Sequence, residues 1–205
     1  MIRVRVLLFL ATLALGTTAC FAADPAPAPS VIALGDDARQ LREDFNQAQG
    51  SIRLVLVVDP ACSVCLRGMA DVNEALLATT TDPRLQTFVV HVPVIGATAK
   101  DVPPSMELLH NPHVRHYWNA SGSVGHQVSV ALQLKRGEKP VYAWDVWMIY
   151  GADAAWPAGA PPTPALFMHQ LPALRGQPER PFLDSAAFAA KALELLARLP
   201  PTEAK

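Results

Sequence analysis

The feature that most constrains the fold is a buried-strand pattern that passes directly into a helix pattern. Residues 52–58, Ile-Arg-Leu-Val-Leu-Val-Val, are almost continuously apolar and rich in valine, as expected for a strand buried on both faces of a parallel sheet. The Asp-Pro-Ala sequence at 59–61 ends this run, and a helix is predicted to begin near Cys62. The core-facing stripe of that helix, at spacings of four, three and four, consists of Cys65, Met69, Val72 and Leu76.

Strand and helix patterns alternate along the rest of the chain. Asp36 or Asp37 can cap a helix that Gly50 ends. The strand after the Cys62 helix is parallel to 52–58 if that helix is a right-handed crossover. In chain order, the predicted elements are a strand at 31–34, a helix at 37–48, strands at 52–58 and 86–92, an irregular segment at 95–137 with short helical pieces at 105–109 and 114–119, a strand at 141–150, its hairpin partner at 165–171, and a helix at 185–199.

Length and charge limit the classes of function. The chain has 205 residues, enough for one domain with a real hydrophobic core once the first two dozen are set aside as a targeting signal. Lys and Arg total 17 and Asp and Glu total 18, so the chain lacks the basic footprint that neutralises nucleic-acid phosphates. We therefore predict one α/β domain, residues 31–205, that does not bind nucleic acid.

The first residues have the pattern of a secretory signal peptide. Arg3 and Arg5 form a positive region, residues 6–15 form an apolar run, and small residues come next. The apolar run is too short to span a bilayer as a helix of the mature protein. We therefore predict a signal peptide at 1–23, a stiff Pro/Ala-rich tether at 24–30, and export to a bacterial periplasm.

Two processing routes stay open for this signal. Signal peptidase can cut after Ala22, or Cys20 can become the lipidated first residue of a lipoprotein. Thr17 stands where a lipoprotein signal normally has an aliphatic residue, which favours the first route. An uncleaved membrane anchor is the remaining alternative.

The folded domain holds two cysteines, because Cys20 belongs to the signal region. They lie in the sequence Cys62-Ser63-Val64-Cys65, and in an oxidising compartment each has only the other as an intramolecular partner. A ring this short constrains the unfolded chain very little, so its stabilising value is small. We interpret the pair as redox-active, with a shared metal site and an inert disulfide as the alternatives.

The predicted helix gives the two cysteines different roles. Cys62 lies where a helix exposes unpaired N–H groups and the positive end of its dipole, so we predict a lowered pKa for its thiol. Cys65 lies one turn later on the buried stripe, where a thiol stays protonated and shielded. Cys62 is therefore the predicted attacking sulfur, and Cys65 resolves the mixed disulfide.

The element order and the motif together resemble a known family. Asp59-Pro60-Ala61-Cys62-Ser63-Val64-Cys65 after a valine-rich strand is similar to the Asp-Pro-x-Cys-x-x-Cys entry of periplasmic thiol:disulfide interchange proteins of the disulfide-isomerase type, which have a thioredoxin-like fold. The resemblance covers residues 31–199 and is motif-specific over 52–78. It implies a three-layer αβα sandwich with an insertion at about 95–137, and a redox-active disulfide without another cofactor.

The resemblance also implies a cis-proline that faces the cysteine pair just ahead of the next strand. Pro140 is favoured because it precedes the predicted strand at 141–150. Thr163-Pro164 has the Thr-Pro sequence common in this type but lies one strand later. Two ordinary loop prolines with trans bonds are the alternative.

The chain departs from thioredoxin itself in its acidic residue. Thioredoxin's buried acid aligns near Leu56, which is apolar here. Asp59 can accept a proton from Cys65, although a turn or cap role at the strand end is favoured. Asp145, within the predicted strand at 141–150, is a second candidate, and a hydrogen-bonded edge residue is again the favoured interpretation.

Three histidines at spacings of three, His110, His113 and His116, form a further candidate metal site. Pro112 disfavours a continuous helix there, so we predict a solvated loop. His91 is interpreted as a core or edge residue.

These patterns support three hypotheses for function. The leading one is an exported thiol-disulfide oxidoreductase that acts on protein thiols or disulfides or takes electrons from a membrane donor. The second is a periplasmic protein that handles copper, mercury or zinc through the same thiols. The third is an interaction protein that uses the segment at 95–137.

Overall fold

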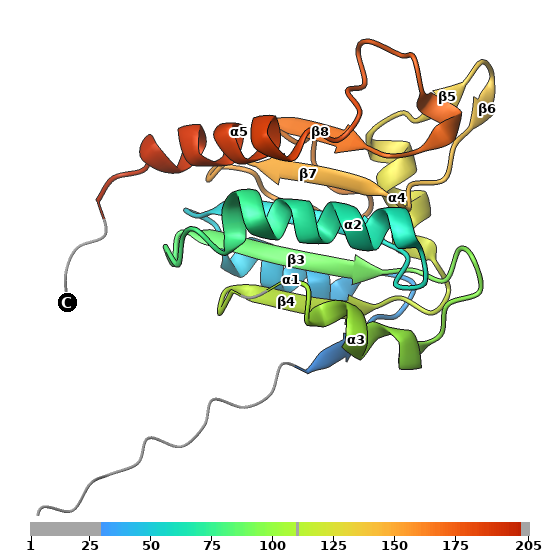
Figure 1. Ribbon diagram of the computed structural model, residues 1–205, viewed down its shortest axis with the longest axis horizontal. Coiled ribbons are helices and arrows are strands. Elements are labelled where there is room, and N and C mark those ends of the chain that lie inside the picture. Colours follow the sequence, from blue (N-terminus) through green and yellow to red (C-terminus); the bar gives the residue numbers. More distant parts are fainter. Residues whose placement is uncertain (1–29, 110, 202–205) are drawn as a thin grey trace, which may run out of the picture.

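Strand β2 (Ile52–Val58) is buried along its whole length inside a six-stranded sheet, as its apolar sequence predicts. The computed structural model describes residues 30–109 and 111–201. The first four strands across the sheet run parallel, β7 runs antiparallel to β2, and β8 runs antiparallel to β7. Their order across the sheet (Figure 1) is β1 (Val31–Ala33), β4 (Val114–Trp118), β3 (Leu85–His91), β2, β7 (Val146–Tyr150) and β8 (Leu166–His169).

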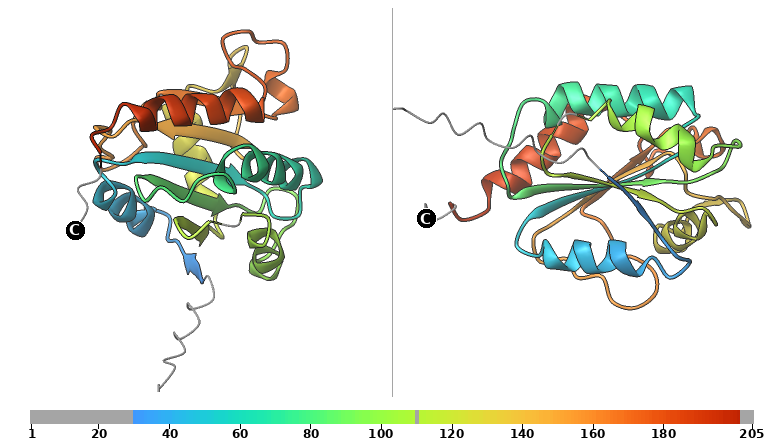
Figure 2. Two further views of the ribbon diagram at one scale, coloured as in Figure 1. Left: turned by 60° about the vertical axis from the view of Figure 1, so that its left-hand side comes forward. Right: turned by 90° about the horizontal axis from the view of Figure 1, so that it is seen from below.

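Helices cover both faces of this sheet, which Figure 2 shows edge-on in its right-hand view. One face carries α2 (Ser63–Val72) with a π-helical turn at Asn73–Leu77, α3 (Val102–Met106) and α5 (Ser185–Ala197). The other face carries α1 (Arg39–Gln47) and α4 (Ser123–Ala131). An apolar cluster fills the space on each face, and the α2 cluster includes the four residues of the predicted stripe.

This arrangement confirms the predicted three-layer α/β fold class. A parallel β2–α2–β3 unit is followed by the antiparallel pair β7–β8 and by α5, which is the thioredoxin-like order expected from the sequence. Within the described residues, no helix has the length and apolar character needed to cross a membrane. The predicted signal peptide, including Cys20, and the tether up to residue 29 lie outside the described residues.

The segment at 95–137 differs most from its prediction, because it contributes a strand to the main sheet. Residues 114–118, predicted as part of a helical piece, form β4 between β1 and β3. Their Val-Arg-His-Tyr-Trp sequence is rich in side chains that favour strands, and pairing on both sides adds to that preference. The helix α4 was not predicted, because its Gly and β-branched residues have low helix propensity.

The strand predicted at 141–150 is also shorter than expected. β7 begins only at Val146, and the chain before it forms a small hairpin of β5 (Lys135–Arg136) and β6 (Lys139–Pro140). Two short 3₁₀ turns, Ala99–Asp101 and Pro172–Leu174, complete the elements. The late start of β7 leaves Asp145 immediately ahead of the strand that pairs with β2.

Candidate active site

Cys62 is the N-cap residue of α2, at the carboxyl end of β2. Its backbone is extended, with φ −85° and ψ 112°, and its Sγ accepts a hydrogen bond from the Cys65 N–H at 3.2 Å. This N–H is one of the groups that a helix leaves unpaired at its first turn. A sulfur in this position therefore receives both a hydrogen bond and the positive end of the helix dipole, and both stabilise a thiolate.

Asp59 holds the turn between β2 and α2. One carboxylate oxygen accepts the Ala61 N–H at 2.8 Å, and the other accepts the N–H groups of Val94 and Ile95, both at 2.7 Å. The side chain is fully buried and ties the segment after β3 to the start of the cysteine helix. This confirms the interpretation of Asp59 as a turn residue.

Cys65 lies beneath Cys62 with no exposed surface, as predicted for the shielded cysteine. Burial raises the pKa of its thiol well above the ordinary value, and the neighbouring negative charge of Asp145 and the hydrogen bond to Cys62 raise it further. The two cysteines are both present as free thiols. Cys65 is therefore a thiol that needs a partner to take its proton before it can attack.

Asp145 is the group in place to take that proton. The donor atoms of Cys62, Cys65 and Asp145 all lie within 4.8 Å of one another. Burial raises the pKa of the Asp145 carboxyl to about 6, and the hydrogen bonds from Trp147 and from Cys65 oppose that shift. The carboxyl therefore changes its protonation near neutral pH, beside a thiol that must lose a proton.

Neighbouring residues fix the position of Asp145. The Trp147 Nε1–H donates to its carboxylate at 3.0 Å, and the Gln170 N–H donates to its backbone carbonyl at 3.0 Å. Gly68 of α2 permits this arrangement, because a Cβ at that residue would lie 2.7 Å from Trp147 Cζ2 and 2.5 Å from Gln170 Oε1. Sequence reasoning did not identify Trp147, Gln170 or Gly68.

The expectation of a cis-proline at Pro140 is wrong. No peptide bond within the described residues is cis, so Pro140 and Pro164 are both trans. Pro140 is exposed in the hairpin strand β6, where it pairs with Lys135, and Pro164 lies in the loop ahead of β8. The hairpin displaces Pro140 from the start of β7, and Asp145 lies directly ahead of that strand instead.

The histidines do not gather at the cysteines. His110 lies outside the described residues, and the His113 Nε2 lies 3.3 Å from the Thr81 carbonyl oxygen. His116, predicted in a solvated loop, is buried in β4 instead, where its Nδ1 lies 3.2 Å from Nε2 of His91. Burial lowers the pKa of His91 to about 3, with a contribution from His116, and that of His116 to about 4.

The cysteine site also has the donor set for a soft metal ion. Two thiolates and one carboxylate within 4.8 Å of one another can share an ion that prefers sulfur, and Cys-x-x-Cys is a common zinc-ligand spacing. Across the described part of the chain, these three residues form the only group of three or more such donors.

The chain is similar to known proteins in structure, without a match in sequence. No protein-family model matches the sequence, and a search of curated proteins finds no match. Seven chains of solved structures are similar, and two of them serve as examples. One is a secreted Mycobacterium tuberculosis disulfide oxidoreductase described as homologous to E. coli DsbE, with 13% identity, a TM-score of 0.45, and coverage of 73% of this chain and 85% of that one.

A second similar structure is a thiol:disulfide interchange protein of the thioredoxin family from Chlorobium tepidum TLS. It has 11% identity and a TM-score of 0.46, and the match covers 73% of this chain and 83% of that one. Both scores are below 0.5, so the chemistry of the site is inferred from the residues of this chain alone.

Proposed function

We propose that this chain is an exported thiol-disulfide oxidoreductase that works by dithiol–disulfide exchange at Cys62 and Cys65. The observation that carries the proposal is the asymmetry of the pair. The sulfur of Cys62 accepts an N–H at the start of α2, whereas Cys65 is sealed beneath it beside the Asp145 carboxyl. An inert disulfide needs neither the helix terminus nor a carboxyl that titrates near pH 6.

In the reductive direction, the Cys62 thiolate attacks one sulfur of a substrate disulfide. A Cys62–substrate S–S bond forms, and the second substrate sulfur leaves as a thiolate that takes a proton from water. The Cys65 thiol then gives its proton to the Asp145 carboxylate and attacks the Cys62 sulfur. The bond between Cys62 and the substrate breaks, and the first substrate sulfur leaves as a thiolate. The substrate has then gained two electrons, and the chain holds a Cys62–Cys65 disulfide.

The same steps in reverse oxidise a substrate dithiol. The partners proposed for either direction are protein thiols and disulfides, with a membrane electron donor to reset the pair. Export is supported by the positive, apolar and small-residue sequence of the first 23 residues. An oxidising compartment is where a pair of this kind cycles.

The test is to trap the mixed disulfide. The Cys65→Ser variant, incubated with oxidised glutathione, should hold glutathione on Cys62 as a stable adduct detected by intact mass. Wild-type chain should pass through the same adduct and end as the internal disulfide. The matched control is Cys62→Ser in the chain cut after Ala22, which should stay unmodified because its remaining cysteine, Cys65, has no exposed surface. A Cys65→Ser chain that forms no adduct contradicts the proposal.

The donor set at the site supports a second candidate function, the holding of a soft metal ion. Its supporting observation is the 4.8 Å grouping of the two sulfurs and the Asp145 carboxylate. Metal analysis after purification without chelators separates the two functions. A metal handler carries about one ion per chain, and its thiols react only after the ion is stripped.

A further inference from the structure

Five cationic side chains gather at one end of the molecule, on two segments far apart in the sequence. One segment is the β5–β6 hairpin, and the other is the loop between β8 and α5, which lies beside it (Figure 1). Arg180 joins them, because its guanidinium donates to the carbonyls of Lys135 at 3.1 Å and Gln133 at 2.8 Å. We define the basic surface as Lys135, Arg136, Lys139, Arg175 and Arg180.

These cations differ from most of the other described Lys and Arg residues, of which five of nine form ion pairs. None of the five cations of the basic surface forms an ion pair within residues 30–109 and 111–201, and four of them are exposed. In the other segments, five cations form ion pairs with carboxylates: Arg39, Arg84, Arg115, Lys191 and Arg198.

The basic surface also stands out against the charge of the remaining molecule. Its two segments contain three carboxylates, Glu138, Glu179 and Asp184, against the five cations. The other described residues carry nine Lys and Arg against thirteen Asp and Glu. A local excess of positive charge on a chain that is otherwise acidic attracts an anionic partner and orients it on approach.

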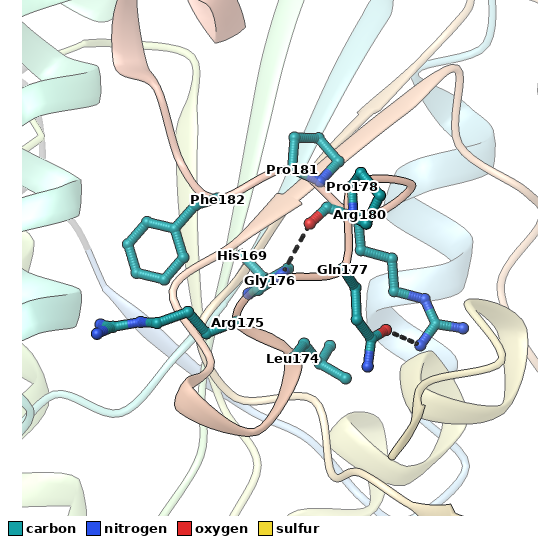
Figure 3. Close-up of a pocket in the computed structure, with 9 residues that line it drawn as sticks. All are labelled: His169, Leu174, Arg175, Gly176, Gln177, Pro178, Arg180, Pro181 and Phe182. Atoms are coloured by element: carbon teal, nitrogen blue, oxygen red, sulfur yellow. Dashed lines mark hydrogen bonds between the residues drawn. The ribbon is translucent and has the colours of Figure 1, made fainter. Parts of the chain in front are cut away.

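The loop of the basic surface lines an open cavity of about 440 Å³ (Figure 3). Leu174, Pro181 and Phe182 give it apolar walls, and the Arg175 guanidinium lies 5.5 Å from the centre of the Phe182 ring. His169 contributes an uncharged wall: its Nδ1 accepts the Leu171 N–H at 3.0 Å, so its Nε2 carries the proton that it donates to the Arg180 carbonyl at 3.1 Å. The cavity suits an apolar side chain, with cations at its rim.

This loop is connected to the cysteine site at both ends. At its start, the Gln170 N–H donates to the carbonyl of Asp145, the residue beside Cys65. At its end, Leu183 packs against α2, where its Cδ2 lies 3.1 Å from the position of a Cβ on Gly68. A protein segment bound along the loop would therefore lie close to the start of the cysteine helix.

We propose that the basic surface docks an acidic segment of the partner protein whose sulfur reacts at Cys62, with one apolar side chain of that segment in the loop cavity. The description of the partner as a redox substrate rests on the proposed function, whereas docking of an acidic segment does not. Direct ionic contacts with the exposed, unpaired cations supply the selectivity.

The test uses the full reduced chain and a fluorescein-labelled peptide of Asp, Glu and Gly with one central Phe and no cysteine. Fluorescence anisotropy should show binding that weakens as salt is added, and a peptide with Asn and Gln in place of the acids should bind at least about fivefold more weakly. Arg136→Glu with Arg175→Glu should weaken binding of the acidic peptide at least about fivefold. The control with the same charge change, Arg42→Glu with Lys100→Glu, should alter it less than about twofold.

Docking is contradicted if the neutral peptide binds as tightly as the acidic one, or if the control variant loses as much affinity as the variant of the basic surface. Because the peptide has no cysteine, its binding is independent of exchange. A chain that exchanges with glutathione and ignores the acidic peptide refutes the docking surface alone. A chain that binds the peptide through Arg136 and Arg175 but forms no glutathione adduct refutes the proposed function and leaves the docking surface standing.

Discussion

Two buried groups of titratable side chains lie on the α2 face of the sheet, and they differ in the place and the chemistry of their outermost member. His91 and His116 face the same side as Val89 and Val114, which belong to the α2 cluster, since alternate residues of a strand share a face. The two histidine rings are hydrogen-bonded to each other, and both are buried. The cysteine site is buried as well, with Cys65 fully covered and Cys62 6% exposed, but Cys62 lies at a helix terminus.

The difference shows what turns buried titratable groups into a reactive site. The Nδ1 atom of His91 has no hydrogen-bond partner. The two imidazoles contact only each other through their ring nitrogens, so this pair has no reactive atom that a substrate can reach. At the cysteine site the buried proton acceptor is next to a thiol that is one exchange step from a substrate sulfur. The histidine pair is accordingly expected to affect stability, and the cysteine site to affect turnover.

Removing one member from each group should separate them most sharply. Cys62→Ala should reduce disulfide exchange to the uncatalysed rate, because Cys65 is buried and cannot meet a substrate. His91→Gln should retain most of the wild-type rate at neutral pH. Turnover of a fluorescent disulfide peptide in glutathione buffer measures both. Equal losses in the two variants would break the distinction between the groups.

The role of Asp145 predicts the next largest effect. Asp145→Asn should slow the release of glutathione from the mixed disulfide by about a hundredfold or more, since the Cys65 thiol loses its proton acceptor. In wild type, the rate of this step should rise with pH through about 6, the pKa of the Asp145 carboxyl, and the variant should lack that inflection. Rapid-quench mass analysis follows the adduct. An unchanged pH profile would mean that Asp145 only shapes the site.

The two groups should change stability with pH in opposite directions. The histidine pKa values are about 3 and about 4 in the folded chain against 6.5 as the ordinary value, so the unfolded chain binds more protons in that window and stability falls as pH falls from 6.5. The Asp145 pKa is about 6 against 3.8, so the folded chain binds more protons and stability falls as pH rises from 3.8 through about 6.

Denaturant unfolding of the reduced chain from pH 4 to pH 8 measures both slopes. At pH 7, Asp145→Asn should be more stable than wild type by about 2 kcal/mol, the free energy of a shift of this size with some allowance for solvent. His91→Gln should flatten the loss of stability on the acid side. A loss of stability in Asp145→Asn at pH 7 would contradict the cost assigned to the buried carboxylate.

The smallest expected effect concerns the support of the site. Gly68→Ala should destabilise the chain by about 1–2 kcal/mol, because the clash of its Cβ with Trp147 and Gln170 exceeds the gain in helix propensity. It should also slow the resolving step, since Trp147 holds the Asp145 carboxylate. Chemical denaturation and the glutathione adduct assay report the two effects. Wild-type behaviour in both would show that the Trp147 contact is not needed.

The sequence predicted the parts of the fold whose hydrophobic pattern is local. The bounds of β2, the buried stripe of α2 and the place of Cys62 at the helix start follow from runs and spacings within about twenty-five residues. β4 could not be recognised in the same way, because its place is decided by pairing with β1 and β3.

The candidate site was predictable only in its cysteines. Asp145 carried a signal, a lone acid in an apolar run, but its contact with Cys65 depends on where β7 begins after the β5–β6 hairpin. Pro140 matched the expected position in sequence and not in space, for the same reason. Gly68 and Gln170 gave no signal, since their role arises only from the approach of α2 to the β7–β8 pair.

The measurement that tests the central claim most directly is a metal-free glutathione redox titration of the chain, with free thiols counted by alkylation and mass. The account predicts a single two-electron transition of Cys62 and Cys65 with a midpoint between roughly −120 and −270 mV, the range of catalytic pairs. A pair that resists reduction beyond about −300 mV would be a structural disulfide and would contradict the account.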